Sequence, residues 1–134
     1  MNTEEMMART RRFALDVIAL SDLLPNKPSG WVLGKQVLRS GTSVGANYSE
    51  AQRSRTRLEF NSKIHLCQQE LEETIYWFSL IQDASLVPAK KLSPLVSEAS
   101  ELRAILRTPP TPVYCLRLAY QGFTSAHVAP LYCI

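Results

Sequence analysis

The chain has 134 residues and a mass of 15.1 kDa, which suits one domain and leaves no room for separate cofactor-binding and substrate-binding domains. Hydrophobic residues make up 46% and charged residues 20%, the proportions of an ordinary globular protein. Fifteen Lys and Arg against twelve Asp and Glu leave a net charge of +3. This charge is far below that of a dedicated nucleic-acid tail, so the composition permits an RNA partner without requiring one.

The cysteines and the first residues indicate a reducing compartment. Cys67, Cys115 and Cys133 are odd in number and widely spaced, and they form neither a Cys-x-x-Cys pair nor a zinc-ribbon pattern. The first residues are acidic where a secretory or organelle signal would be basic, and no run of about 18 apolar residues occurs. We therefore expect a cytoplasmic protein with no membrane partner.

The first predicted element is an amphipathic helix over residues 5–24. Its apolar residues recur every three or four positions, at Phe13, Val17, Leu20 and Leu24. Two prolines and a glycine within residues 25–30 cannot continue a helix, so they predict a short connection.

The second predicted helix begins near Gly30 or Trp31 and carries three further glycines. Its apolar stripe consists of Leu33, Val37, Val44 and Tyr48. Gly34, Gly41 and Gly45 interrupt the helix, and each costs about 1 kcal/mol relative to Ala. Because their spacing places these glycines on one face, we predict that a neighbouring helix approaches them closely.

A capping box marks the start of the third predicted helix. Thr56 and Glu59 have the spacing at which the threonine accepts from the Glu59 amide and the glutamate reaches back to the Thr56 amide. The helix runs through Asp83. Its core stripe is nearly unbroken and consists of Phe60, Ile64, Cys67, Leu71, Ile75, Phe78 and Ile81.

The fourth predicted helix covers the apolar residues between Leu92 and Leu106 and ends before Thr108. Pro94 fits this helix only if Ser93 caps it and the proline lies near the first turn, or if the helix is kinked.

Four such helices with short links predict an all-α fold, an antiparallel up-and-down four-helix bundle over residues 1–108. Residues 109–134 contain several prolines and a single charged residue, Arg117. We expect this apolar tail to lie outside the bundle.

A pattern typical of serine hydrolases occurs in the second helix. Residues 41–45 match the Gly-x-Ser-x-Gly nucleophile elbow, and Ser43, Asp83 and His127 follow in the order of a hydrolase triad. The elbow requires a strand before it and a helix after it, and the chain has no strand pattern. The favoured interpretation is therefore that these small residues serve helix packing. If the triad were real, the protein would hydrolyse a generic ester, and Ser43→Ala would abolish that activity.

A two-metal centre within the bundle is not favoured either. Such centres use Glu-x-x-His pairs, and no such pair occurs around His65. The carboxylates of Glu50, Glu70 and Glu73 are expected to be solvated or ion-paired. We therefore predict no catalytic residues, no metal and no cofactor.

Three polar residues of the second helix share one face. Ser43, Asn47 and Glu50 lie at i, i+4 and i+7 beside the glycines. Polar groups on a packed face must be hydrogen-bonded, so we predict a buried network that reaches the third helix at Glu70 or at the capping region. A structural role is favoured over ligand binding.

Basic residues gather in the first half of the chain, where residues 1–63 contain ten Lys and Arg against six Asp and Glu. Seven of them form the candidate nucleic-acid-binding set: Arg9, Arg11, Arg12, Arg53, Arg55, Arg57 and Lys63. Such clusters bind phosphate backbones through charge neutralisation and counterion release. The alternative is a set of solvated charges around the turn between the second and third helices.

The segment of residues 38–60 resembles the hallmark of a bacterial family. It contains, in order and without gaps, Ser43, Ala46, Asn47, Glu50, Arg53, Ser54, Glu59 and Phe60. This spacing is similar to that of the four-helix-bundle family named for the intervening sequences of 23S rRNA genes. Residues 69–77 and 97–102 resemble the family's third- and fourth-helix signatures, and the resemblance covers about residues 10–108.

The resemblance implies a bundle assembled as a homopentamer, in which the motif residues Ser43, Asn47, Glu50, Glu59 and Phe60 are structural. Family members are linked to ribosomes through the location of their genes. Relatives that serve diversity-generating retroelements form basic pentamers that bind reverse transcriptase and nucleic acid, and in comparison this chain is only mildly basic. The leading hypothesis is a non-enzymatic oligomeric scaffold that binds RNA or a ribonucleoprotein partner through the basic set. The alternative is a self-assembling protein-interaction module with no nucleic-acid role.

Overall fold

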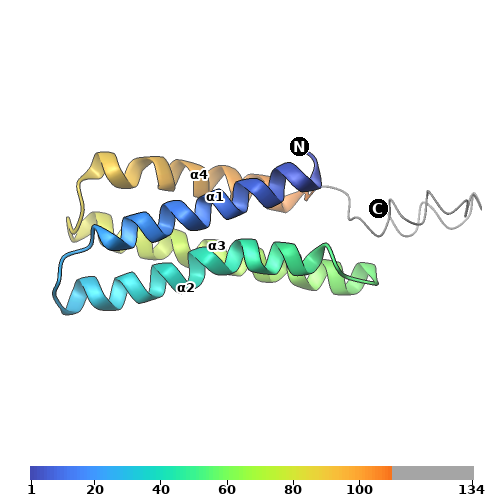
Figure 1. Ribbon diagram of the computed structural model, residues 1–134, viewed down its shortest axis with the longest axis horizontal. Helices are drawn as coiled ribbons and strands as arrows, with labels where there is room; N and C mark the ends of the chain where they lie inside the picture. The colour runs from blue at the N-terminus through green and yellow to red at the C-terminus, as the bar shows by residue number, and fades with distance from the viewer. Residues whose placement is uncertain (110–134) are drawn as a thin grey trace, which may run out of the picture.

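The computed structural model describes residues 1–109, which form four α-helices joined by short connections (Figure 1). The helices are α1 (Thr3–Asp22), α2 (Pro28–Ala51), α3 (Arg57–Asp83) and α4 (Ala89–Arg107). Each helix runs antiparallel to the next, and α1 packs against both α2 and α4 while α3 packs against α2 and α4. The predicted all-α four-helix bundle is confirmed. The tail predicted over residues 109–134 lies, apart from Pro109, outside the described residues.

Side-chain caps fix the starts of α1 and α3. At α1 the side chain of Asn2 accepts from the Glu5 amide and Glu5 accepts from the Asn2 amide, both at 2.8 Å, a complete capping box that the sequence analysis missed. At α3 the Thr56 hydroxyl accepts from the Glu59 amide at 3.1 Å, as predicted. The Glu59 carboxylate, however, accepts from the Arg55 amide at 2.9 Å. The prediction that the Glu59 carboxylate accepts from the Thr56 amide was therefore wrong, because the donor is the amide one residue earlier.

The helix α4 begins before Ser93, which rules out the predicted arrangement in which Ser93 caps the helix and Pro94 lies in its first turn. It starts at Ala89 after Pro88, so Ser93 does not cap it, and Pro94 lies within the helix in its second turn. There the proline has no N–H to donate to the Lys90 carbonyl. The predicted end before Thr108 is confirmed, since the helix ends at Arg107.

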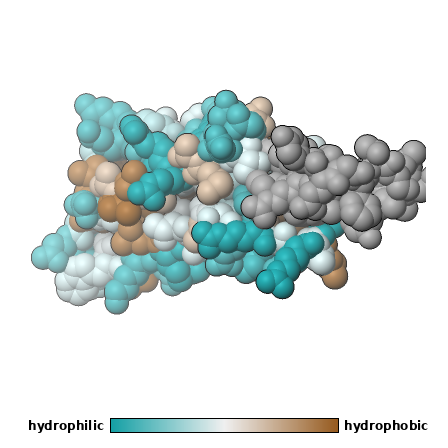
Figure 2. Space-filling view, turned by 45° about the vertical axis from the view of Figure 1, so that its right-hand side comes forward, coloured by the Kyte–Doolittle hydropathy of each residue, from teal (hydrophilic) through white to brown (hydrophobic). Residues whose placement is uncertain are grey.

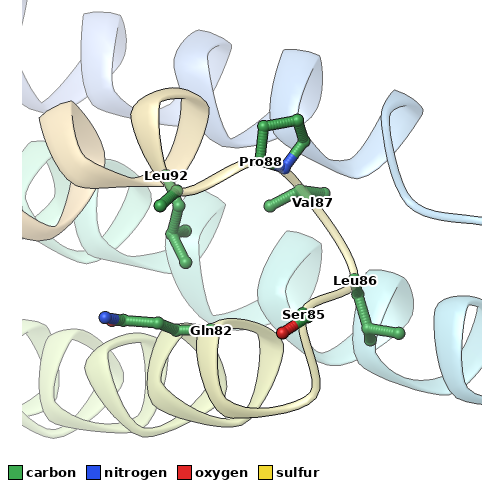
Figure 3. Close-up of a pocket in the computed structure, with 7 residues that line it drawn as sticks. Gln82, Ser85, Leu86, Val87, Pro88 and Leu92 are labelled. Atoms are coloured by element: carbon green, nitrogen blue, oxygen red, sulfur yellow. The ribbon is translucent and has the colours of Figure 1, made fainter.

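The connection from α3 to α4, drawn in Figure 3, begins with a Schellman motif at the end of α3. The Leu86 amide donates to the Ile81 carbonyl at 3.1 Å, and the Ser85 amide donates to the Gln82 carbonyl at 3.0 Å. Ser85 occupies the left-handed position of this motif with a φ of 52°. The motif satisfies the last carbonyls of α3 and turns the chain toward α4.

Two glycines of α2 face α1, and Gly41 lets α1 approach closely. A Cβ atom on Gly41 would lie 2.9 Å from both γ-methyl carbons of Val17, and one on Gly45 would lie 3.4 Å from backbone atoms of Thr10. The predicted close approach is confirmed at Gly41, where the approaching helix is α1. At Gly45 the distance is that of an ordinary contact with α1, and at Gly34 the neighbour is the Leu24 side chain and not a packed helix. Val17 therefore lies in a recess on the surface of α2, and any side chain at position 41 would fill this recess.

The core is apolar with a small polar insertion. Phe13 and Phe78 meet edge to face with ring centroids 6.4 Å apart, and both side chains are buried. Between α2 and α3 the buried hydroxyls of Ser40 and Thr74 lie 2.8 Å apart. The Ser40 hydroxyl donates to the Gln36 carbonyl, and the single Thr74 proton is shared between the Ser40 oxygen and the Glu70 carbonyl, so both hydroxyls are satisfied inside the core.

Burial of Tyr48 predicts a loss of stability at alkaline pH. Burial raises the pKa of Tyr48 from 10.0 to about 12. The unfolded chain therefore releases the phenolic proton between pH 10 and 12 while the folded chain retains it. The stability that the neutral phenol contributes is full below pH 10 and is lost as the pH rises toward 12.

We expect Tyr48→Phe to lose less stability than the wild type between about pH 9 and pH 11, by about 1.4 kcal/mol at the upper pH. Urea unfolding at a series of pH values measures the difference. Because the pKa of the buried Cys67 thiol is also raised to about 12, the wild type and the variant share that second contribution. Parallel pH profiles for the two proteins would contradict the burial of the phenol.

Candidate nucleic-acid interface

The turn between α2 and α3 presents two exposed basic residues of the candidate set, Arg53 and Arg55. Backbone bonds from Arg53 to the Glu50 carbonyl and from Ser54 to the Ala51 carbonyl, at 3.0 and 3.1 Å, fold the chain back after α2. Ser54 is buried, whereas Arg53 and Arg55 are exposed. Neither of these arginine side chains makes an ion pair with any residue within 1–109. Two positive charges therefore face solvent beside the start of α3.

Arg57 and Lys63 continue the basic set along α3. Arg57 is the first residue of the helix and is half-buried. The Lys63 ammonium forms an ion pair with the Glu50 carboxylate of α2. This hydrogen bond lowers the pKa of Glu50 and raises the pKa of Lys63. A phosphate that binds Lys63 must therefore compete with a carboxylate.

Arg9 lies on a different side of the molecule, because α4 binds its guanidinium. Its Nε and Nη2 atoms donate to the two carboxylate oxygens of Glu98 at 2.6 and 2.9 Å, and Nη2 also donates to Glu101. These hydrogen bonds raise the pKa of Arg9 further above its ordinary value. Two carboxylates around one guanidinium leave little positive charge for a nucleic acid.

The remaining two arginines of the set are exposed on α1. Arg12 lies 3.5 Å from Asp16 one turn later, an i, i+4 pair on the helix surface. Arg11 lines a hollow of about 310 Å³ between α1 and α2, together with Met7, Ala14 and Ala46. The structure thus separates the seven residues into the turn, the α1–α4 contact and the outer face of α1.

The predicted buried network of Ser43, Asn47 and Glu50 was wrong. Ser43 donates to the Arg39 carbonyl at 2.6 Å and Asn47 donates to the Ser43 carbonyl at 3.0 Å, so both bonds stay within α2. Glu50 alone reaches α3, through its exposed pair with Lys63. The helix period identified the shared face correctly, but this face lies at the edge of the α2–α3 contact and is half open to water.

Ser43 lies in the middle of α2 and not on a strand-to-helix turn, so the elbow geometry of a hydrolase is absent around it. Asp83 is the last residue of α3, and His127 lies outside the described residues. The glycines of the elbow pattern serve the contact with α1 described above.

A hollow of about 470 Å³ lies at the α3–α4 connection (Figure 3). Its wall includes Gln82, Ser85, Val87 and Leu92, and none of its lining side chains titrates near neutral pH. Over residues 1–109, no three His, Cys, Asp or Glu side chains lie close enough together to hold a metal ion. The same stretch has no helix that is both long and apolar enough to span a bilayer.

Two residues that the sequence reasoning missed belong to the surface of α2 and α3. Arg39 bonds to Glu70 at 3.2 Å and also to Glu73, and it ties the middle of α2 to α3. Leu58 is 81% exposed between Arg57 and Glu59 at the basic turn. The sequence could have indicated this exposure, because Leu58 lies outside the apolar stripe that begins with Phe60 and Ile64.

Comparisons with known proteins agree with this architecture. A model of the 23S rRNA-intervening sequence protein matches residues 3–108, from the first residue of α1 to the residue after α4. A crystal structure from Bacteroides thetaiotaomicron, of a protein of unknown function from the S23 ribosomal protein family, is similar with a TM-score of 0.71 and 30% identity. The likeness covers 75% of this chain and 94% of that chain. No curated protein matches. Because the family model spans the whole bundle, the chain belongs to the 23S rRNA-intervening sequence protein family.

Proposed function

We propose that the protein is a non-enzymatic, homo-oligomeric scaffold of the cytoplasm that binds RNA through the α2–α3 turn. The observation that carries this proposal is the exposure of Arg53 and Arg55 without an ion-pair partner within residues 1–109. Arg57 and Lys63 extend the positive charge into α3. The names of the matched family and of the solved relative refer to 23S rRNA and to a ribosomal protein family, which supports RNA as the partner class.

Assembly into a homopentamer supplies the affinity that one turn lacks. Two or three phosphate contacts bind RNA weakly at physiological salt. Five turns on one particle raise the overall affinity if they contact the same RNA simultaneously. Light scattering on the purified protein measures the assembly, and a ring of five has five times the 15.1 kDa chain mass. A particle that stays monomeric at all concentrations would contradict this part of the proposal.

The RNA-binding test compares two turn arginines with two lysines at the opposite end of the bundle. Fluorescence anisotropy measures binding to a 23S rRNA fragment and to an unrelated RNA at about 50 and about 200 mM salt. Arg53→Gln/Arg55→Gln is expected to weaken binding at the lower salt by about 10-fold or more and to reduce the salt slope by about two. Lys90→Gln/Lys91→Gln removes the same charge at the start of α4 and is expected to change binding by less than about 2-fold.

Each outcome of this test separates the proposed function from general charge attraction. Equal losses in the two double variants would show that net charge alone drives binding. The absence of binding at low salt would exclude the RNA role. A preference for the 23S rRNA fragment that persists at the higher salt would identify it as a specific target.

A second candidate function is a protein-interaction module that assembles without nucleic acid. It is favoured by exposed apolar side chains on α1 and α2, namely Leu15, Ile18, Trp31 and Val32, each of which is at least 42% exposed. This function predicts normal assembly for the Arg53→Gln/Arg55→Gln variant and no RNA binding by the wild type.

A further inference from the structure

Leu58 at the start of α3 is more exposed than the other large apolar side chains of residues 1–109. It is 81% exposed, against 58% for Val32 and 57% for Trp31. Because an α-helix turns by about 100° per residue, Leu58 lies about 200° around α3 from Phe60, with which the core stripe begins. The core of the bundle therefore does not require a leucine at this position. A lone exposed leucine is common on protein surfaces, but this one lies within the basic set.

Basic side chains precede Leu58 along the chain. Arg57 comes directly before it in α3, and the exposed Arg53 and Arg55 lie in the turn before the helix. The Cα atoms of Arg55 and Leu58 lie within about 11 Å of each other, because three residues of chain span no more than this. Figure 2 shows a small apolar spot among hydrophilic side chains at the lower right, toward the end of the bundle that carries the α2–α3 turn in Figure 1. A molecule whose phosphates contact the turn arginines can therefore reach an apolar side chain as well.

Hydrogen bonds hold the backbone on both sides of Leu58. The Glu59 amide donates to the Thr56 hydroxyl at 3.1 Å, and the Phe60 amide donates to the Thr56 carbonyl at 3.0 Å. The Glu59 carboxylate accepts from the Arg55 amide at 2.9 Å, so this carboxylate is already engaged by the backbone of the turn. Leu58 therefore projects from a preorganised turn, and a preorganised contact loses less conformational entropy on binding.

We propose that Leu58 contacts an unpaired base of the bound RNA, so that the α2–α3 turn selects RNA with unpaired nucleotides over a continuous duplex. This inference rests on the RNA role proposed above. An A-form duplex presents phosphates, 2′-hydroxyls and a shallow minor groove to a protein, and the faces of its bases are stacked inside. Unpaired bases can be splayed out, and their faces then accept apolar and aromatic side chains. Of the two, RNA with unpaired bases is the one that matches the arginines and the leucine together.

The two kinds of contact respond differently to salt. Contacts between arginines and phosphates release counterions, so their contribution to the affinity falls as the salt concentration rises. The apolar contact of Leu58 releases no counterions, so its contribution persists. We therefore expect the affinity for every RNA to fall with salt, while the ratio of the affinities for unpaired and paired RNA stays nearly constant.

A leucine among arginines also suits an anionic bilayer, into which apolar side chains insert. The composition of the turn favours RNA, because Leu58 is the single large apolar residue between Arg53 and Glu59. Membrane binding scales with the apolar area that is buried, and even a whole myristoyl chain binds a bilayer only marginally on its own. One leucine side chain buries far less area, so we expect no measurable binding to vesicles of phosphatidylcholine and phosphatidylserine in equal parts.

Two RNAs of equal charge test the contact of Leu58 with a base. Fluorescence anisotropy at about 50 and about 200 mM salt compares a hairpin that has an unpaired loop with a duplex that has the same number of phosphates. The wild type is expected to bind the hairpin more tightly than the duplex, by about 5-fold or more. Leu58→Ala is expected to weaken hairpin binding by about 5-fold and duplex binding by less than about 2-fold, without a change in the salt slope. Leu58→Phe is expected to bind the hairpin at least as tightly as the wild type, since bases stack on aromatic rings.

The control variant is Leu66→Ala, which makes the same change about 12 Å further along α3, where the side chain is 38% exposed. It is expected to change neither affinity by more than about 2-fold, and light scattering checks that all variants assemble like the wild type. Equal affinities of the wild type for the two RNAs, or an equal loss for both in Leu58→Ala, would overturn this inference and leave the RNA role intact. Vesicle binding that depends on Leu58, without a preference for the hairpin, would overturn it in favour of a bilayer. No binding to either RNA would remove the proposed function and this inference together.

Discussion

Gly30→Ala is expected to destabilise the bundle by about 3 kcal/mol, at the upper end of the usual cost of overpacking. A Cβ atom at this position would lie 1.9 Å from the Pro25 carbonyl oxygen and 3.0 Å from the Pro25 carbonyl carbon. Both are backbone atoms of the α1–α2 connection, so no side-chain rotation relieves the clash. The first turn of α2 must move away from the connection, and the packing of α1 on α2 moves with it. Urea unfolding followed by circular dichroism measures the change in the free energy of unfolding.

Gly34→Ala is the matched control on the same helix, one turn later. A Cβ atom there would lie 3.4 Å from the Leu24 Cδ1 atom, the end of a flexible side chain. Because Ala favours the helix over Gly, this variant is expected to keep or gain stability, by up to about 1 kcal/mol. A Gly30→Ala protein as stable as Gly34→Ala would show that the connection does not pass over Gly30 as described.

Phe78→Ala is expected to cost about 3 to 5 kcal/mol, the usual range for removing a buried phenylalanine. The ring is 1% exposed, and it meets Phe13 of α1 edge to face across the centre of the bundle. Its removal leaves a cavity that helices on both sides line, and rigid helices collapse into such a cavity only in part. A shift of the urea midpoint at an unchanged slope would show that stability alone has changed.

Tyr76→Ala provides the comparison for this second prediction. Tyr76 lies two residues earlier on α3, is 55% exposed, and contacts Trp77 at a centroid distance of 5.0 Å. We expect a loss below about 1 kcal/mol, because most of the ring already faces water. Similar losses at positions 76 and 78 would mean that α3 is rotated relative to the structure described.

The bounds of a helix could be predicted from the sequence where both a cap and a stripe were recognised; at α1, where the Asn2 cap was not, the predicted bounds of 5–24 lie two residues late. For α3 the Thr56 cap and the unbroken apolar stripe gave the start and the end to within a residue. For α4 the start was missed because the residue before Ala89 is Pro88, which has no side-chain oxygen to signal a cap. Periodicity thus locates a helix more securely than it locates its first turn.

The candidate site could be predicted only where its residues are neighbours in sequence. Arg53 and Arg55 lie in one turn, so local spacing sufficed to place them together. Arg9 joins Glu98 and Glu101, which are 89 and 92 residues later, and helix periodicity gives the face of a residue without giving the helix that faces it. The same limit explains why Ser43 and Asn47 were placed in a buried network: their shared face is evident from spacing, but the depth of that face is not.

The recess around Gly41 also selects the hand of the bundle. An up-and-down bundle that turns left and one that turns right bury the same stripes with the same connections, so hydrophobic pattern alone does not distinguish them. In α2 the glycines face α1, and Arg39 on the other side binds α3. The opposite hand would exchange these neighbours, leaving Val17 without its recess and Glu70 and Glu73 without Arg39. Two glycines that weaken α2 as an isolated helix thereby help to exclude the mirror-related topology of the whole domain.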